Sequence, residues 1–372
     1  MNEHYLKYIF INFFISKIIE LIIDYSKNNI VLYINMFWYS LLFVTLFSLN
    51  ANADTQCPTI SSPADRRSGN KSHFRLMQYN VEWLFTDYYS NAACPGTGCP
   101  WKNISEAETH MNYVTNVIAT LNPDFVNLCE VEGCDELNEL SNNLNKNTVS
   151  YKPYLIKGTD SATGQNVGII TKLDPTVNLY RDESRVSYPI PGSKCGYTGA
   201  SGTEGISKHY ITEMKLGIYN VALIGLHLLA YPTDVTRCVE RESQSIVAQN
   251  IIKSYLDKNY EVIVMGDLND YDNEVPDLNN SQSISQVLEI LKVNGQLKPV
   301  SELIEQSERY TDWWNKDGSS NSSSDEFTMI DHILVTPNLY NHIVNSFIYH
   351  GYQEFSGTYN SDHYPMVIDF EF

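Results

Sequence analysis

The sequence predicts an α/β fold made of two similar halves. In each half an amphipathic helix precedes an apolar strand, and the strand ends in a carboxylate, which is Glu130 in the first half and Asp267 in the second. The chain has 372 residues, of which 43% are hydrophobic, enough for one large α/β domain or two small ones. No boundary after residue 72 divides the chain, so we expect a single domain at 73–372.

The first half contains two predicted helices between short strands. Apolar residues recur at helical spacing up to Pro123, and a leucine-rich helical face follows the buried strand that carries Glu130. The expected elements are, in order, a strand at 74–79, a helix at 106–121, a strand at 125–131, a helix with Leu137, Leu140 and Leu144 on one face, and strands around Tyr154 and Val167.

The second half repeats this order around Asp267. The expected elements are a strand near Tyr210, a strand at 219–229, a helix at 234–256, a strand at 261–265, an exposed Ser-rich loop at 318–324, and strands at 328–335, 343–349 and 364–372. Ligands of α/β sheets usually bind at the carboxyl ends of the strands. We therefore expect Glu130 and Asp267 to lie on the same rim.

Residues 1–53 differ in composition from the rest of the chain. They contain two apolar stretches, at 8–23 and 37–49, and the second is followed by Ala51-Asn52-Ala53. An apolar run that ends in small residues is typical of a signal peptide, so we predict a leader at 1–53 with cleavage after Ala53.

The start of the protein leaves two alternatives open. With initiation at Met36 the first apolar stretch is untranslated, whereas with initiation at Met1 the two stretches could anchor the chain in a membrane. A polar extension at 54–72 follows the leader. We predict a protein that is secreted or delivered to the lumen of the secretory or endolysosomal pathway.

The cysteines and the glycosylation motifs agree with export. All seven cysteines follow Ala53, which suits an oxidising compartment, and they are Cys57, Cys94, Cys99, Cys129, Cys134, Cys195 and Cys238. We expect Cys94 and Cys99 to form a short disulfide, and leave open whether Cys129 is the odd thiol or pairs with Cys134. Four Asn-x-Ser motifs predict a glycoprotein, at Asn70, Asn103, Asn279 and Asn321.

The charge balance limits how the protein can meet an anionic substrate. Asp and Glu number 44 against 25 Lys and Arg, which gives a formal net charge of −19. No broad basic surface is therefore available to attract a polyanion through counterion release. A phosphate substrate has to be met by a local charge, and a bound divalent cation is the obvious candidate.

Six short segments place a polar or ionisable residue at the edge of an apolar strand. They are Tyr79-Asn80-Val81, Cys129-Glu130-Val131, Leu226-His227-Leu228, Gly266-Asp267-Leu268-Asn269, Ile330-Asp331-His332 and Ser361-Asp362-His363. Each one alone is compatible with a turn cap or a satisfied core residue. Together, in this order, they resemble the endonuclease/exonuclease/phosphatase superfamily, the deoxyribonuclease-I-like fold, over roughly 74–372.

The resemblance implies a fold and a cofactor. The fold is a four-layer α/β sandwich, in which two packed mixed sheets are covered by helices on both outer faces. The cofactor is Mg²⁺, with Mn²⁺ or Ca²⁺ as alternatives, because hard oxygen ligands suit these cations. Glu130 would be the principal metal ligand, helped by Asn80 and Asp362.

The same resemblance implies roles for the remaining motif residues. Asp267 would orient or deprotonate the attacking water, and Asn269 would donate a hydrogen bond to a phosphate oxygen. His227 and His363 would bracket the phosphate, and Asp331 would orient His363. The expected reaction is in-line attack of water on phosphorus.

Two weaker matches give candidate substrate-binding residues. Asn166 lies in Gly164-Gln165-Asn166-Val167-Gly168, which resembles the family's entry into a strand, although Gly before an apolar strand is common. Arg241 begins Arg241-Glu242-Ser243-Gln244 on the long helix, where a solvated helix face is an equal alternative.

The predicted function is a secreted, monomeric nuclease that hydrolyses DNA or RNA and needs no stable protein partner. The same chemistry also serves sphingomyelinases and inositol-phosphate phosphatases, and an inactive extracellular binding module is the alternative outside enzymes. Cys129 stands where many family members carry Gln, and acidic Glu132 lies nearby, which weakens the case for DNA. An exposed loop with Tyr310 and Trp313-Trp314 would favour lipid, unless these rings pack in the core.

Overall fold

The computed structural model describes residues 57–60, 66, 71–86, 98–146, 150–319, 322–352 and 359–372. They belong to one compact unit, Asp54–Phe372. The predicted leader with its cleavage after Ala53 lies outside the described residues, as do Cys94, Asn70 and Asn321. None of the helices in the described part of the chain combines the length and the hydrophobicity needed to cross a membrane.

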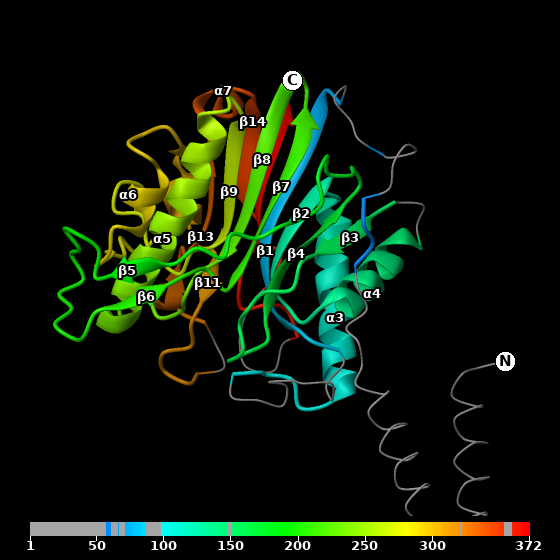
Figure 1. The fold of residues 1–372 in the computed structure, drawn as a ribbon. Helices are drawn as coiled ribbons and strands as arrows, with labels where there is room; N and C mark the ends of the chain where they lie inside the picture. Colours follow the sequence, from blue (N-terminus) through cyan, green and yellow to red (C-terminus); the bar gives the residue numbers. More distant parts are fainter. Residues whose placement is uncertain are drawn as a thin grey trace, which may run out of the picture. The chain divides into compact units, whose positions relative to one another are not determined.

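The architecture is the expected four-layer sandwich (Figure 1). One sheet has six strands in the order β14-β15-β1-β2-β4-β3, and the other has five in the order β10-β13-β9-β8-β7. The first sheet comprises β1 (His73–Leu84), β2 (Phe125–Val131), β3 (Lys152–Leu155), β4 (Asn166–Thr171), β14 (Ile343–Ile348) and β15 (Met366–Glu371). The second comprises β7 (Lys208–Leu216), β8 (Tyr219–His227), β9 (Glu261–Asp267), β10 (Lys298–Pro299) and β13 (Asp331–Val335).

Helices cover the outer face of each sheet. The first sheet packs against α3 (Ile104–Leu121) and α4 (Cys134–Asn145), and the second against α5 (Val235–Leu256) and α6 (Val287–Leu291). The remaining elements are two small strand pairs, β5 (Val186–Tyr188) with β6 (Gly202–Glu204) and β11 (Asp312–Trp313) with β12 (Phe327–Thr328), the helix α7 (Pro337–Tyr340), and 3-10 turns at Val300–Leu303, Gln306–Glu308 and Ser324–Glu326.

The two halves repeat one unit, as the sequence predicts. In the first sheet β1 and β2 are parallel and are connected through α3, and in the second β8 and β9 are parallel and are connected through α5. An antiparallel strand flanks each pair, β4 beside β2 and β13 beside β9. Because the strands of a parallel pair end at the same edge, each sheet delivers two motif residues to one rim.

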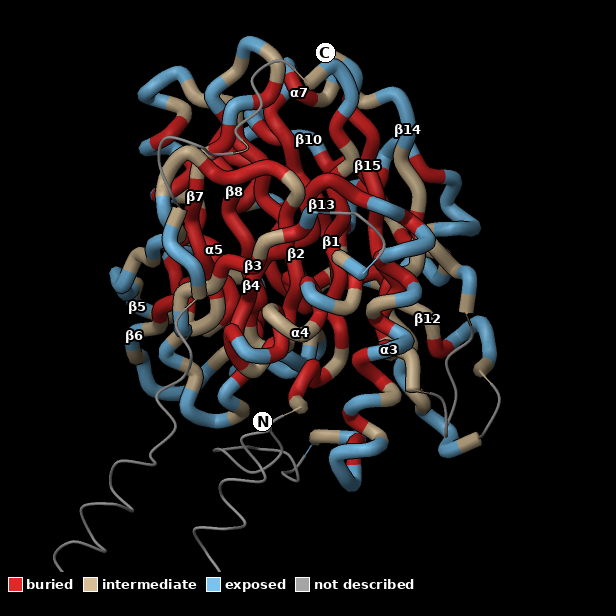
Figure 2. The backbone as a smooth tube through the Cα atoms, turned by 90° about the vertical axis from the view of Figure 1, so that its right-hand side faces the viewer, coloured by how far each residue is buried: buried red, intermediate tan, exposed pale blue. Residues whose placement is uncertain are grey.

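Alternation along the strands divides the hydrophobic core into layers. On β1, Phe74 and Leu76 point into the core between the sheets, whereas Met77 and Tyr79 point toward α3. Successive side chains of a strand point to opposite faces, so Gln78 and Asn80 continue the inner row. The inner face of β1 therefore changes from apolar to polar along the strand. The strands of both sheets are largely buried (Figure 2).

One expectation about the strands needs correction, and one strand pair was not expected. The strand predicted at 328–335 is broken into β12 and β13, because the hydroxyl of Thr311 accepts hydrogen bonds from the backbone N–H groups of Ile330 and Asp331. These two N–H groups are therefore not available for hydrogen bonds to a neighbouring strand, and the strand is interrupted there. The β5–β6 pair was not predicted, since its three-residue strands show too little alternation to stand out.

The disulfides resolve the alternative left open for Cys129. Cys57 pairs with Cys134 and Cys195 with Cys238, while Cys129 is a free, buried thiol. Cys99 is also disulfide-bonded, and its expected partner lies outside the described residues. Burial raises the pKa of the Cys129 thiol, so it is the inert odd cysteine of the chain.

His209 on β7 gives the fold a dependence on pH. Its Nε2 accepts a hydrogen bond from the backbone N–H of Asp182 at 3.0 Å, so the folded state favours the neutral ring. Burial and the nearby Arg181 lower the pKa of His209 from 6.5 to about 4. This stabilisation is complete above pH 6.5 and is lost as the pH falls through the folded pKa.

We expect the free energy of unfolding to fall by about 3 kcal/mol through this residue between pH 6.5 and 4, at about 1.4 kcal/mol per pKa unit. Urea titrations of the wild type and of His209→Gln, which keeps an acceptor but does not titrate, measure the difference. His73→Gln at an exposed position is the matched control. An equal pH dependence in all three proteins would contradict the assignment.

Candidate active site

The motif residues gather at one end of the space between the two sheets. A pocket of about 630 Å³ opens there and is lined by Glu130, His227, Asp267, Asn269, Asp362 and His363, among others. These residues come from the ends of β2, β8 and β9 and from the segment before β15. The structure therefore brings both halves of the chain to one rim, as the repeated unit predicts.

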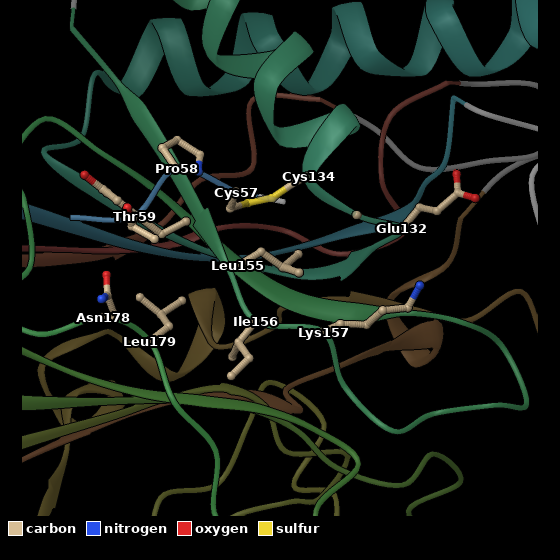
Figure 3. A pocket seen from close by; sticks show the side chains of 12 residues that line it. Cys57, Pro58, Thr59, Glu132, Cys134, Leu155, Ile156, Lys157, Asn178 and Leu179 are labelled. Atoms are coloured by element: carbon tan, nitrogen blue, oxygen red, sulfur yellow. A yellow bond between two sulfur atoms is a disulfide. The ribbon is translucent and has the colours of Figure 1, made fainter. Parts of the chain in front are cut away.

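A second pocket lies elsewhere on the molecule (Figure 3). It has a volume of about 470 Å³, and the Cys57–Cys134 disulfide and the side chains of Leu155 and Leu179 form part of its wall. Its charged lining residues are Glu132 and Lys157. It has no histidine and no group of carboxylates, so the chemistry belongs to the first pocket.

Glu130 reaches the pocket through an irregularity in β2. Strict alternation would place it on the outer face with Val126 and Leu128, beneath the helices. Its backbone instead has φ 67°, and the pairing of β2 with β4 shifts register between Cys129 and Val131. This bulge turns the carboxylate inward, where its Oε2 accepts a hydrogen bond from the backbone N–H of Trp83 at 3.1 Å.

Asn80 connects the two halves of the site. Its Nδ2 lies 3.3 Å from Glu130 Oε1 and donates to Asp267 Oδ2 at 3.0 Å, while its Oδ1 accepts from the backbone N–H of Glu82 at 3.1 Å. The amide nitrogen, not the oxygen, thus faces the carboxylates. Asn80 orients Glu130 and Asp267 in this arrangement, and a direct contact of its oxygen with a metal would require the amide to turn over.

Asp267 is at the end of β9, directly after Gly266. A Cβ at Gly266, where φ is 155°, would stand 1.8 Å from the carbonyl oxygen of Leu226 on β8. Only glycine allows the two strands to approach this closely, and the approach places His227 in register with Asp267. The Gly of the motif is therefore a packing requirement of the site.

We expect Gly266→Ala to destabilise the fold by about 3 kcal/mol or more, because the clash is with backbone that cannot rotate away. Gly295→Ala is the matched control, since Gly295 also has positive φ but nothing within 4 Å of the added carbon, and should cost about 1 kcal/mol. Chemical denaturation of both variants measures the difference. Equal losses would show that the β8–β9 approach tolerates a side chain.

His363 is held by a carboxylate on the side that faces away from the pocket. Its Nδ1 lies 2.7 Å from Asp331 Oδ2, and the other oxygen of Asp331 accepts from Gln78 Nε2 at 2.9 Å. Burial lowers the pKa of His363, but Asp331, Asp362 and Asp267 outweigh it and hold the pKa well above its usual value. His363 is therefore an imidazolium, with Nε2 directed at the site.

His227 has the opposite electrostatic character. Its Nε2 lies 3.7 Å from Asp267 Oδ2 and 4.0 Å from Glu130 Oε1. Burial, Lys208 and His363 together hold the pKa of His227 well below its usual value. The site thus pairs one cationic with one neutral imidazole.

The surroundings of Asp267 disfavour the ionised form of its carboxyl group. Burial and the neighbouring Asp331 and Glu130 raise its pKa to about 8, although His363 acts in the opposite direction. Its Oδ1 accepts from the backbone N–H of Asn269 at 2.9 Å. With a pKa of about 8, the carboxyl group of Asp267 is ionised, and able to accept a proton, in a fraction of the molecules that grows as the pH rises.

The sequence profile of the Endonuclease/Exonuclease/phosphatase family matches residues 77–363. The chain belongs to this family. The search of curated proteins found no significant match.

Solved structures of the family resemble the chain at low sequence identity. A truncated TDP2 from Caenorhabditis elegans is 16% identical, with a TM-score of 0.48, over 81% of this chain and 98% of the other. A humanized D. rerio TDP2 is 18% identical, with a TM-score of 0.49, over 81% and 100%. A family protein from Leptotrichia buccalis is 13% identical, with a TM-score of 0.49, over 80% and 100%.

Membership in the endonuclease/exonuclease/phosphatase family confirms the resemblance inferred from the six motifs. It indicates a hydrolase of phosphate esters, of a kind that generally uses divalent metal ions. The six motifs lie on the elements expected for them, and the predicted four-layer sandwich is confirmed.

The pocket suits a hydrated, hard divalent cation. Glu130, Asp267, Asp312 and Asp362 all line it, and the basic side chain among the lining residues, apart from histidine, is Lys316. In the described part of the chain the one group of three close ligand atoms is Cys195, Cys238 and Glu242, whose sulfurs already form a disulfide. These lining carboxylates form an open set of oxygens, which suits a hard divalent cation that keeps most of its waters.

The two predicted substrate-binding residues lie outside the pocket. Asn166 is buried, and its amide donates to the backbone oxygens of Glu132 and Gly164 while accepting from the N–H of Gly158. Arg241 is fully buried and donates to backbone carbonyls of the loop after β8. Both residues support loops, and neither is among the residues that line the pocket.

Asp312 is a site residue that the sequence did not indicate. Its Oδ1 lies 3.5 Å from His363 Nε2, and its backbone forms an isolated bridge with His363. Burial is the main cause that raises the pKa of Asp312. Asp312 and Trp313 form the two-residue strand β11, which is too short to show a periodic pattern. Only the pairing of Asp312 with His363, 51 positions later in the chain, reveals it.

Proposed function

We propose that the chain is a Mg²⁺-dependent phosphodiesterase, and that its substrate is nucleic acid, DNA or RNA. The observation that supports this most directly is that His363, held by Asp331 at 2.7 Å, lines one pocket together with His227 and Asp267, whose side chains lie 3.7 Å apart. Hydrolysis of a phosphodiester needs a positively charged hydrogen-bond donor beside the phosphate and a base beside the attacking water, and both have to lie close together.

Each residue then has a task in the hydrolysis. Asp267 takes a proton from the attacking water, and the imidazolium of His363 donates from Nε2 to a phosphate oxygen as charge builds up there. Asp331 is a positioning residue that fixes the ring of His363. Water attacks phosphorus in line and the bond to the leaving oxygen breaks; that oxygen takes up a proton from solvent while Asp267 releases its proton to solvent, so a phosphate monoester and an alcohol result.

Glu130 and Asp362 would hold the cation, and Asn80 keeps Glu130 aligned from its amide nitrogen. When bound, Mg²⁺ supplies a Lewis acid that neutralises negative charge on the phosphate. Asn269 donates a hydrogen bond to a phosphate oxygen through the second proton of its amide group. The first proton is already donated to the carbonyl of Leu228, 3.1 Å from Nδ2.

The test is hydrolysis by the purified protein of plasmid DNA, RNA, sphingomyelin and an inositol phosphate side by side, with Mg²⁺ and with EDTA. Cleavage of nucleic acid that EDTA abolishes supports the proposal. Turnover of lipid or inositol phosphate alone would retain the chemistry and replace the substrate, and inactivity on all four would favour a binding module.

We also propose that the protein is exported. Its disulfides support this, because such bonds persist in oxidising compartments. Sequencing the amino terminus of the protein collected from the medium or the lumen should give Asp54 as the first residue. Retention of residues 1–53 on membranes would contradict cleavage after Ala53.

A further inference from the structure

Two aromatic side chains are exposed beside the catalytic pocket. Tyr231 is 69% exposed and Trp314 is 67% exposed, and both line the pocket that contains His363 and Asp267. By contrast, Tyr310 stacks on His350 and contacts Tyr364, and Trp313 is partly buried. The aromatic segment considered in the sequence is therefore divided, with Trp314 as its exposed ring.

A buried arginine fixes the loop that carries Tyr231. Arg241 donates to the carbonyls of Leu229, Tyr231 and Pro232 at 3.0, 3.0 and 2.9 Å, and its Nε lies 3.3 Å from Asp270 Oδ2. Tyr231 itself has φ 69°, a conformation that a bulky residue adopts only when its surroundings impose it. The loop is thus held so that the ring stays in solvent.

The buried carboxylate of Glu326 holds the loop that carries Trp314. Glu326 accepts hydrogen bonds from Trp313 Nε1 at 3.0 Å and from the backbone N–H of Lys316 at 2.9 Å. Its carbonyl oxygen accepts from the backbone N–H of Trp314 at 3.0 Å. Two aromatic rings on the same pocket are therefore each anchored through a buried charged residue.

We propose that Tyr231 and Trp314 are stacking platforms for the bases of single-stranded nucleic acid next to the scissile phosphate. This inference rests on the proposed function and narrows its substrate class. Rings that are already exposed on hydrogen-bonded loops require little ordering of the backbone on binding, and every base offers them a flat face. Bases inside a duplex are not available to such rings, so the platforms favour single strands.

The surroundings of the rings argue against insertion into a membrane. Trp314 is followed by Lys316 and Asp317, and Tyr231 by Asp234, all of them exposed. These charges would have to leave water if the rings entered a bilayer, which is costly. The formal net charge of −19 opposes contact with anionic lipid and with the phosphates of nucleic acid alike, so stacking on the bases has to supply the attraction near the rings.

The test compares three ligands: a single-stranded oligonucleotide, the same strand with abasic sugars around the cleavage site, and the duplex. Binding is measured by fluorescence anisotropy in the full chain carrying Asp267→Asn, so that no cleavage interferes. We expect tighter binding of the base-bearing strand than of the abasic strand, by about tenfold for each ring. Tyr231→Ala and Trp314→Ala should each remove about tenfold, and Tyr231→Phe should retain the preference.

The matched control is Tyr113→Ala, an exposed tyrosine on α3 that does not line the pocket, and it should leave all three affinities unchanged. Loss of the base preference in both ring variants supports the platforms. Equal affinity of the protein with both rings intact for the base-bearing and the abasic strand overturns them. Because binding is measured without turnover, a protein that cleaves no nucleic acid fails the proposed function in a separate assay.

Discussion

Replacement of His363 by alanine is expected to lower kcat/KM for a phosphodiester by about a thousandfold, the usual contribution of a positioned acid or hydrogen-bond donor. In the proposed reaction the imidazolium of His363 is a cationic donor to the phosphate, and Asp331 lies 2.7 Å from its Nδ1. The loss should appear mainly in kcat, because the charge on the phosphate is greatest in the transition state.

His73→Ala is the control for this substitution, since His73 is exposed at the start of β1 and lies away from the pocket. Asp331→Asn should give an intermediate loss, because the ring remains but its orientation and charge are no longer supported. Thermal unfolding of all three variants separates loss of chemistry from loss of fold. A decrease of less than tenfold for His363→Ala in a folded protein would remove His363 from the reaction.

Replacement of Glu130 by glutamine is expected to weaken Mg²⁺ binding by about a hundredfold, because a neutral amide substitutes for the principal carboxylate ligand. In the wild type, Mg²⁺ at about 100 times its Kd should raise the free energy of unfolding by about 3 kcal/mol. The variant should show almost none of this increase at the same concentration. Thermal or urea unfolding measures the effect without any assay of hydrolysis.

Glu108→Gln, at an exposed position on α3, is the matched control and should keep the full response to Mg²⁺. EDTA should remove the stabilisation of both the wild type and this control. If Glu130→Gln kept the Mg²⁺-dependent increase, the cation would be held by Asp267, Asp312 or Asp362 instead, and the assignment of Glu130 would be incorrect.

Hydrophobic periodicity was enough to predict the main elements. The helix expected at 106–121 is α3, the strand at 125–131 is β2, and the helix at 234–256 is α5 with Asp234 as its N-cap. Long amphipathic helices and fully apolar strands owe their pattern to the layers on either side of them, so the pattern survives in the sequence. The short strands β5, β6 and β11 are stabilised by tertiary contacts and leave no such pattern.

The motif residues could be named from the sequence, but their arrangement could not. Asn80, Glu130, His227, Asp267 and His363 were all expected at strand ends, and they do meet at one pocket. The inward turn of Glu130 depends on a bulge with positive φ, and a one-residue bulge has no signature in the local sequence. Asp312 reaches His363 only through a bridge between distant segments.

The sequence by itself determined which side chains can do chemistry and which face of each strand is apolar, because both follow from residue type and spacing along the chain. Only the tertiary structure decided which of them meet. It buried Arg241 and Asn166 as loop supports, brought Asp312 to His363, and left Tyr231 and Trp314 in solvent. The physical reason is that burial and partnership depend on contacts between residues far apart in the chain, which no local pattern encodes.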